Sequence, residues 1–277
     1  MFIKLRDGNA THYEISGPEG APVVVLIHGV SIPMYCWDLL APRLVQAGYR
    51  VLRYDVYGRG ESAYPKTDYD RSLLMNQLSD LLDVLLGERE KINLVGFSFG
   101  GAMATLFTSR YAQRVQRLAL VSPFARMDPS GDKRPMLRIP VVGDLIMRLK
   151  LRSALRTRAA KLLEAAGLSD EHQRQFEVQA ARSDFCRAFL SLMRGDGLDP
   201  YGPAQKAVAS NNVPTALAWG AADEDISAES IAYTREHLKP RRYLELPGVN
   251  HGGILHPDSG LLPFLLKFLA TPVNEPE

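Results

Sequence analysis

A serine at position 98 stands in a setting that turns a weak hydroxyl into a nucleophile. Residues 94–101 read Leu-Val-Gly-Phe-Ser-Phe-Gly-Gly, so a glycine lies two positions before and two positions after Ser98. An apolar run at 92–95 precedes the motif, and a helix-compatible run at 102–111 follows it. A strand, a sharp turn and a helix in this order strain the serine backbone and expose its hydroxyl above a sheet. The spacing therefore predicts that Ser98 is a catalytic nucleophile.

A serine nucleophile needs a general base, and His251 stands where one is expected. It follows the last predicted strand in the segment Gly248-Val-Asn-His-Gly-Gly, at the carboxyl end of that strand. His256 is the rival, but it precedes Pro257 and the final predicted helix. We therefore predict that His251 takes the proton from Ser98.

The base needs an acid that orients its ring, and the end of the preceding strand supplies one. The segment Trp219-Gly-Ala-Ala-Asp223 reads as a strand, a turn of small residues and a carboxylate. Glu224 and Asp225 are close competitors, because a loop easily absorbs an offset of one or two residues. Asp223 is the predicted acid.

Acyl transfer also needs backbone N–H groups that bind the negative charge of a tetrahedral intermediate. One donor is expected from Phe99, the residue after the nucleophile. The other is expected from Val30, in the loop His28-Gly29-Val30-Ser31 that follows the apolar run 23–27. Gly29 allows the tight turn that presents the Val30 amide, and His28 is expected to hold the loop by hydrogen bonds.

Strand-like and helix-like runs alternate along most of the chain. Continuous β-branched runs such as 23–27 are typical of strands buried on both faces of a parallel sheet. The alternation predicts an α/β fold with a mostly parallel, doubly wound sheet, where ligands bind beyond the carboxyl ends of the strands. The expected strands cover residues 2–6, 11–15, 23–27, 50–54, 92–95, 118–121, 215–219 and 242–246, and the expected helices cover residues 39–47, 72–86, 102–111, 229–238 and 261–270.

The alternation stops between residues 124 and 210. Pro129, Pro135 and Pro140 stand at its start, and stretches with helical periodicity follow. A structureless loop of that length is implausible inside a compact domain. We therefore predict a helical cap at 124–210, inserted after strand six into a core formed by residues 1–123 and 211–277.

Composition limits the class of protein. The chain is 46% hydrophobic and 23% charged, with a formal net charge of +2, which is ordinary for a soluble protein and gives no argument for nucleic-acid binding. No apolar run is long enough to span a membrane, and the N-terminus lacks the pattern of a signal peptide. Cys36 and Cys186 stand far apart, which favours free thiols, a buried Cys36 and a cytoplasmic location.

Six motifs follow one another along the chain: His28-Gly29, Trp37, Asp55-Val-Tyr-Gly-Arg-Gly-Glu-Ser62, Gly96-Phe-Ser-Phe-Gly-Gly101, Trp219-Gly-x-x-Asp223 and Gly248-x-x-His251. Over nearly its full length the chain resembles the α/β-hydrolase superfamily, as a serine esterase- or lipase-like member with a helical cap. The resemblance implies an acyl-enzyme mechanism that uses Ser, His and Asp with no metal and no organic cofactor. It also implies that the cap selects the substrate and that residues 55–62 form a structural loop.

The serine at position 98 argues against two branches of that superfamily, because dehalogenases and epoxide hydrolases carry aspartate there. Esterases, lipases, thioesterases, lactonases, carbon–carbon bond hydrolases, perhydrolases and acyltransferases all remain. We expect a serine hydrolase of carboxylic esters. The alternatives are a carbon–carbon bond hydrolase and a ligand-binding sensor on a hydrolase scaffold.

The cap sequence bears on the substrate and on partners. Its apolar residues, together with Phe97, Phe99 and Phe124 near the predicted site, favour an apolar acyl group on a small-molecule ester. Its basic side chains predict a solvated outer face, and the alternative is a weak contact with an anionic membrane surface or an acyl carrier protein. The basic residues are Arg126, Lys133, Arg134, Arg138, Arg148, Lys150, Arg152, Arg156, Arg158 and Lys161. The sequence does not indicate an oligomeric state.

Overall fold

The computed structural model describes residues 1–127, 134–139 and 141–271. Eight strands form one sheet in the order β1-β2-β4-β3-β5-β6-β7-β8. β1 and β2 form an antiparallel hairpin, β2 pairs antiparallel with β4, and the pairs from β4 to β8 are parallel. The strands are β1 Phe2–Lys4, β2 Ala10–Ser16, β3 Val23–Ile27, β4 Arg50–Tyr54, β5 Ile92–Phe97, β6 Val115–Val121, β7 Thr215–Gly220 and β8 Arg242–Leu246.

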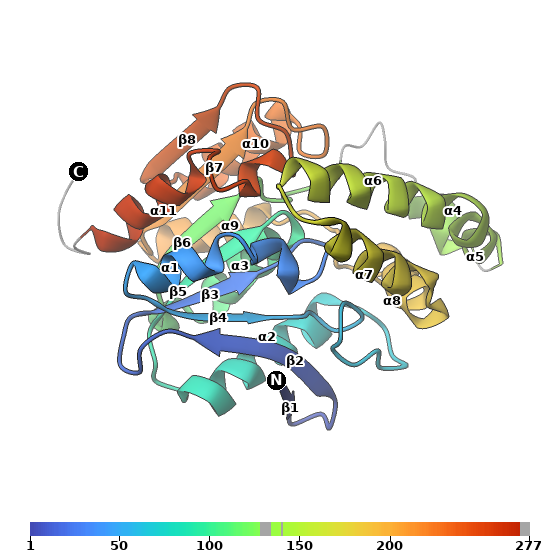
Figure 1. The fold of residues 1–277 in the computed structure, drawn as a ribbon, viewed down its shortest axis with the longest axis horizontal. Coiled ribbons are helices and arrows are strands. Elements are labelled where there is room, and N and C mark those ends of the chain that lie inside the picture. The colour runs from blue at the N-terminus through green and yellow to red at the C-terminus, as the bar shows by residue number, and fades with distance from the viewer. Residues whose placement is uncertain (128–133, 140, 272–277) are drawn as a thin grey trace.

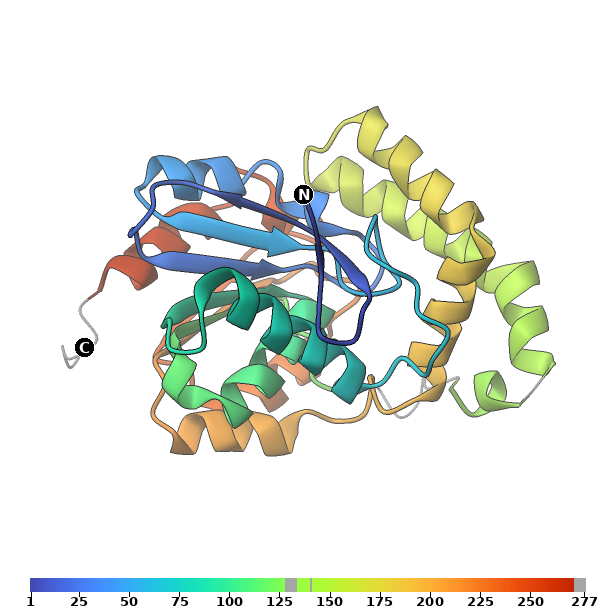
Figure 2. The same ribbon diagram turned by 90° about the horizontal axis from the view of Figure 1, so that it is seen from below.

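Helices cover both faces of the sheet (Figures 1 and 2). The central strands are buried on both faces, and successive residues of β3 belong to different hydrophobic clusters: Val23 and Val25 to one, Val24 and Leu26 to the other. The first cluster includes residues of α2, α3, α9 and α10, and the second includes residues of α1 and α11. These helices are α1 Ala41–Gln46, α2 Arg71–Leu86, α3 Phe99–Arg110, α9 Gly202–Ser210, α10 Ala228–Leu238 and α11 Leu261–Ala270. The predicted doubly wound fold is confirmed.

A group of helices follows β6 and lies over one end of the sheet, within the range predicted for the cap, and we refer to this group as the cap (Figure 1). Its helices are α4 Arg134–Arg138, α5 Val142–Ile146, α6 Arg152–Ala165, α7 Asp170–Ala181 and α8 Ser183–Arg194, with a π-helical turn at Met147–Leu151 between α5 and α6. The next helix, α9, falls within the range we predicted for the cap. It buries Gln205 and Val208 against α3 and α10 of the core, so it is packed as a core helix.

The far end of the cap exposes several apolar side chains to solvent. They lie on and around α4, α5 and the π-helical turn: Met136, Ile139, Val141, Val142, Leu145 and Leu149. Of the prolines expected at the start of the cap, Pro129 and Pro140 lie outside the described residues, as does Lys133 of the basic run. In the described ranges, no helix is both long and apolar enough to cross a membrane.

Candidate active site

Ser98 occupies the turn between β5 and α3. Its backbone has φ 54° and ψ −120°, a conformation that L-residues rarely adopt. The flanking glycines leave room for this turn, because a Cβ on Gly96 would lie 2.3 Å from the carbonyl oxygen of Gly100. A Cβ on Gly100 would lie 2.3 Å from the carbonyl oxygen of Ile27 in β3. The local geometry is therefore that of a strained elbow with a serine at its apex.

His251 and Asp223 lie in contact beyond the ends of β8 and β7. Nδ1 of His251 is 2.7 Å from Oδ2 of Asp223, whose side chain is fully buried. The other carboxylate oxygen accepts the backbone N–H groups of Asp225 and Ile226, each at 2.8 Å. Burial disfavours the charged form of Asp223, but these hydrogen bonds and His251 outweigh it and hold its pKa below the usual range. An ionised Asp223 orients the ring so that Nε2 of His251 is free to accept a proton.

Contacts of Phe97 and Gly29 bring the serine and the histidine to the same edge of the sheet. Phe97, the residue before Ser98, packs its ring on the His251 imidazole with 4.7 Å between the centroids. A Cβ on Gly29, after β3, would lie 3.4 Å from the Cβ of Ser98. The predicted nucleophile, base, acid and oxyanion loop thus gather at the carboxyl ends of β3, β5, β7 and β8, where ligands bind in such sheets.

The competing residues have other partners or face solvent. Asp225 accepts a 2.9 Å hydrogen bond from Nε of Arg158 in α6, and it lies 3.9 Å from Nε2 of His251. Glu224 is exposed. His256 is 42% exposed at its side chain, with Nδ1 4.0 Å from a carboxylate oxygen of Asp258. The contacts therefore favour Asp223 and His251 over these alternatives.

The loop after β3 is held by His28, as expected. Its Nδ1 lies 2.7 Å from the carbonyl oxygen of Gly29, and its Nε2 accepts the backbone N–H of Val56 at 2.9 Å. Burial lowers the pKa of His28 to about 4, so the ring is neutral at pH 7 with its proton on Nδ1. Val30 and Phe99 line one small cavity. Phe99 is also the first residue of α3, where a backbone N–H has no acceptor within the helix.

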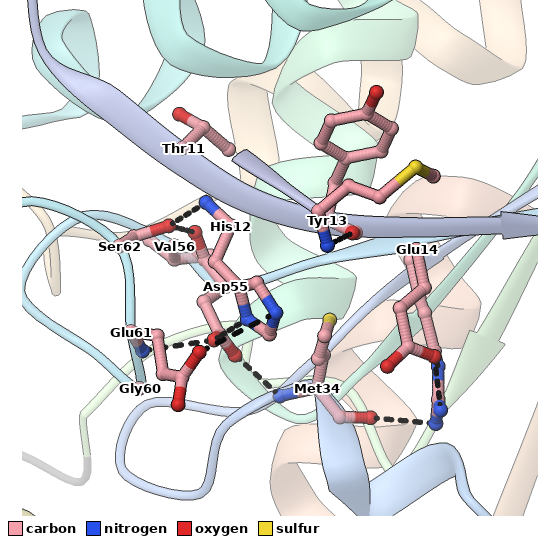
Figure 3. A network of polar contacts seen from close by, with 12 residues as sticks. Thr11, His12, Tyr13, Glu14, Met34, Asp55, Val56, Gly60, Glu61 and Ser62 are labelled. Atoms are coloured by element: carbon pink, nitrogen blue, oxygen red, sulfur yellow. Dashed lines mark hydrogen bonds and ion pairs between the residues drawn. The ribbon is translucent and has the colours of Figure 1, made fainter. Parts of the chain in front are cut away.

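The segment 55–62 wraps around a buried carboxylate (Figure 3). Asp55 accepts the backbone N–H groups of Met34 at 2.9 Å and Glu61 at 3.0 Å, and lies 2.8 Å from Nδ1 of His12. A Cβ on Gly60 would lie 2.2 Å from Oδ2 of Asp55, which explains the glycine there. Asp55 therefore ties β2, the end of β4 and the segment after β3 together, in agreement with a structural role for this loop.

Sequence reasoning missed two residues that border the site. Gln179 of α7 donates from Nε2 to the carbonyl oxygen of Ser31 at 3.0 Å and accepts the backbone N–H of Gly60 at 2.5 Å. Arg59 is 3% exposed and donates from Nε to the carbonyl oxygen of Val30. The sequence carried a weak indication for Arg59, since it stands between two glycines in a motif noted above. It carried none for Gln179.

The remaining expectations concern the cysteines and metals. Cys36 and Cys186 are free, and Cys36 is buried, which raises the pKa of its thiol well above the ordinary value. A buried thiol with a raised pKa is a poor nucleophile. Among the residues that the structure describes, no group of three or more His, Cys, Asp or Glu side chains is placed to hold a metal ion.

Comparison with known proteins identifies the family. The sequence pattern of the alpha/beta hydrolase family matches residues 24–261. This chain belongs to the α/β-hydrolase family. Among curated relatives, a 2-hydroxy-6-oxononadienedioate/2-hydroxy-6-oxononatrienedioate hydrolase of Paraburkholderia xenovorans is 28% identical over 241 residues, which cover 80% of this chain and 78% of that protein.

Other proteins match in part of their length or in fold alone. An uncharacterised protein of Mycobacterium bovis is 31% identical over 142 residues, which cover 47% of this chain and 40% of that protein, so this match spans less than half of the relative's length. The crystal structure of an enol-lactonase from Burkholderia xenovorans superposes with a TM-score of 0.79 at 22% identity, covering 98% of this chain and 100% of that one. This superposition shows the fold of the chain and does not bear on its site residues.

Proposed function

We propose that this α/β hydrolase is a serine hydrolase that cleaves carboxylic esters through an acyl-enzyme on Ser98. The observation that carries the proposal is the 2.7 Å contact between His251 and Asp223, at the same edge of the sheet as a serine held at φ 54°. A serine hydroxyl is activated for attack on a carbonyl when a histidine that a buried carboxylate orients takes its proton.

The proposed reaction has two stages. Oγ of Ser98 attacks the ester carbonyl carbon while Nε2 of His251 takes the hydroxyl proton, and the N–H groups of Val30 and Phe99 bind the oxyanion. The C–O bond then breaks, and His251 returns the proton to the leaving alcohol. Water attacks the acyl-enzyme with His251 again as base, and the carboxylic acid and free Ser98 are restored.

The walls of the cavity beside the elbow suit an apolar acyl group, but its volume of about 10 Å³ is that of about one water molecule, so the walls must move apart to admit the acyl group. Apart from one arginine, discussed below, its lining side chains are mostly aliphatic and aromatic: Val30, Val56, Tyr57, Tyr69, Leu74, Phe99 and Leu192. Burying methylene groups against such walls is favourable by about 0.8 kcal/mol for each group. We therefore propose a preference for esters with an apolar acyl segment over acetates.

The test combines turnover with covalent labelling. Wild type is expected to hydrolyse p-nitrophenyl esters between C2 and C12, and Ser98→Ala is expected to lose at least about a thousandfold in kcat. A fluorophosphonate should label Ser98, read by peptide mass. Ser153→Ala, in an exposed part of α6, is the matched control and should behave as wild type. Turnover that survives Ser98→Ala, or the absence of both turnover and label, would overturn the proposal.

A carbon–carbon bond hydrolase is the second candidate. The relative named as an oxononadienedioate hydrolase, matched over 80% of this chain, favours it. Activity of wild type on a vinylogous 1,5-diketone, with no activity on any ester, would select this candidate.

A surface contact of the cap remains a prediction. The exposed apolar residues at its end lie near exposed basic side chains, including Arg138 and Lys150, which suits a weak contact with an anionic membrane surface. Cosedimentation with phosphatidylserine vesicles that is lost at high salt would support it, and no cosedimentation at low salt would refute it. An acyl carrier protein is the alternative partner of this surface. Binding of the protein to a purified acyl carrier protein, lost at high salt, would support that alternative.

A further inference from the structure

Arg59 is a buried cation beside the predicted oxyanion hole. Its Nε donates to the carbonyl oxygen of Val30, and its Nη1 donates to the carbonyl oxygen of Gly58 at 2.8 Å. Its guanidinium carbon lies 5.5 Å from the ring centroid of Phe185 and 5.4 Å from that of Phe189, both in cap helix α8. Contacts from the core and from the cap together therefore fix the position of the Arg59 guanidinium.

The charge of Arg59 is not balanced by a neighbouring carboxylate. Among the described residues, no Asp or Glu oxygen lies within ion-pair distance of it, whereas Arg53 meets Glu14 and Asp38, and Arg114 meets Asp83. Burial lowers the pKa of Arg59 to about 10, so the group is still cationic at neutral pH. A buried charge without a counter-charge is costly, and proteins retain few of them without a function.

The position of Arg59 connects this charge to the reaction. Its side chain lines the same cavity as Val30 and Phe99, the two residues predicted for the oxyanion hole. This cavity has a volume of about 10 Å³, about that of one water molecule, so it must widen to admit a carboxylate. Val30 links Arg59 to the predicted oxyanion hole, because its carbonyl oxygen accepts a hydrogen bond from Arg59 and its N–H is the predicted donor to the oxyanion. The other lining side chains, among them Tyr57 and Leu192, offer apolar walls and no competing anion.

We propose that Arg59 is an anion subsite that binds a carboxylate of the substrate next to the carbonyl attacked by Ser98. The substrate would then be an ester whose short apolar acyl segment ends in a carboxylate. A planar guanidinium with fixed N–H directions suits a carboxylate, since it forms charge-assisted hydrogen bonds of defined geometry. This inference rests on the proposed function, because it requires the reacting carbonyl in the oxyanion hole.

A purely structural role of Arg59 makes a different prediction. If the side chain only holds the Val30 loop, its loss misplaces one oxyanion donor and slows every ester to the same extent. If it binds a carboxylate, its loss acts on charged substrates more than on neutral ones, and mainly through KM.

The experiment compares two esters of equal length, mono-p-nitrophenyl glutarate and p-nitrophenyl pentanoate. We expect wild type to favour the anionic ester in kcat/KM by about tenfold or more. In Arg59→Gln the ratio of the two kcat/KM values should fall by about ten- to a hundredfold, and Arg59→Lys should retain part of it. Arg156→Gln, an exposed cap arginine, controls for long-range charge and should keep the wild-type ratio.

Equal loss on both esters in Arg59→Gln, or no preference of wild type for the anionic ester, would overturn the subsite. If wild type hydrolyses neither ester, the ester function fails, and calorimetric titration with glutarate tests the subsite by itself. Binding by wild type that Arg59→Gln weakens at least tenfold would still support the subsite, and no binding by wild type would overturn it. Circular dichroism of each variant checks its fold, and Arg59→Lys replaces Arg59→Gln should the latter not fold.

Discussion

At the scale of single residues, strain and buried hydrogen bonds prepare the site before any substrate arrives. Ser98 is 8% exposed in a conformation that only the surrounding glycines permit. Asp223 has both carboxylate oxygens engaged, one by His251 and one by backbone N–H groups. A preorganised site of this kind loses little free energy to rearrangement during the reaction.

The choice of acid can be tested by two matched amide substitutions. Asp223→Asn is expected to lower kcat by about 10³- to 10⁴-fold, because an amide no longer selects the tautomer that leaves Nε2 free. Asp225→Asn is the control, since Asp225 pairs with Arg158, which is 53% exposed at its side chain, and it should cost less than about tenfold. Initial rates on one ester check both. A larger loss in Asp225→Asn than in Asp223→Asn would reassign the acid.

Buried His28 should make stability depend on pH. Its pKa is about 4 in the fold against 6.5 ordinarily, so the unfolded chain binds the proton more readily. Its contribution to the unfolding free energy is therefore fully present above pH 6.5 and is lost as the pH falls towards 4, by about 3 kcal/mol in total. His28→Gln keeps an acceptor for Val56 but does not titrate. Urea unfolding should show that this substitution costs less at pH 5 than at pH 7.5, and an equal cost at both would contradict the assignment.

At the scale of elements, the candidate site lies at the carboxyl ends of four strands, and cap helix α7 contacts the loops beside it. Gln179 of α7 bridges the backbone of Ser31, next to Val30, and the backbone of Gly60, next to Arg59. A single cap side chain therefore touches both loops that border the predicted oxyanion hole.

Gln179 should affect activity as well as stability. Gln179→Leu leaves two backbone groups without their partner, which we expect to cost about 1–3 kcal/mol of unfolding free energy and to lower kcat by loosening the Val30 loop. Gln175→Leu is the control, one turn earlier on the same helix and exposed. Denaturant unfolding and ester kinetics on both variants check the prediction. A Gln179→Leu variant with unchanged kcat would limit the role of the bridge to stability.

At the scale of the whole molecule, cap and core share one hydrophobic cluster. Cap residues such as Leu163 and Phe176 belong to the cluster that also holds Trp37 and Phe97 of the core. We infer that the described parts of the cap and the core unfold together rather than as independent units.

This cooperativity can be measured with two probes. Both tryptophans, Trp37 and Trp219, lie outside the cap, so their fluorescence reports on the core while far-UV circular dichroism includes the cap helices. The two urea transitions should coincide. Phe176→Ala in the cap should lower the unfolding free energy that each probe reports by about 3–5 kcal/mol. A dichroism change that precedes the fluorescence change would show that the cap unfolds first.

The sequence by itself determined the features that depend on local order. The strand and helix boundaries fall within a few residues of the expected ones, because strands buried on both faces read as continuous apolar runs and amphipathic helices repeat every 3.6 residues. Ser98, Asp223 and His251 could be proposed from the sequence, since each follows a predicted strand in a recognisable turn. The packing of helix α9 on α3 and α10 could not be predicted, because a helical periodicity does not reveal which layer a helix packs against.

Only the tertiary structure decided what depends on residues distant in the chain. The proposal of Asp223 over Asp225 as the acid depends on the contact of Asp223 with the ring of His251, 28 positions away. Gln179 bridges to Ser31 across 148 positions and to Gly60 across 119. The buried charge of Arg59 appears only once core and cap enclose it. Such contacts leave no periodic pattern, because they arise from the packing of separate elements and not from the spacing of residues within one.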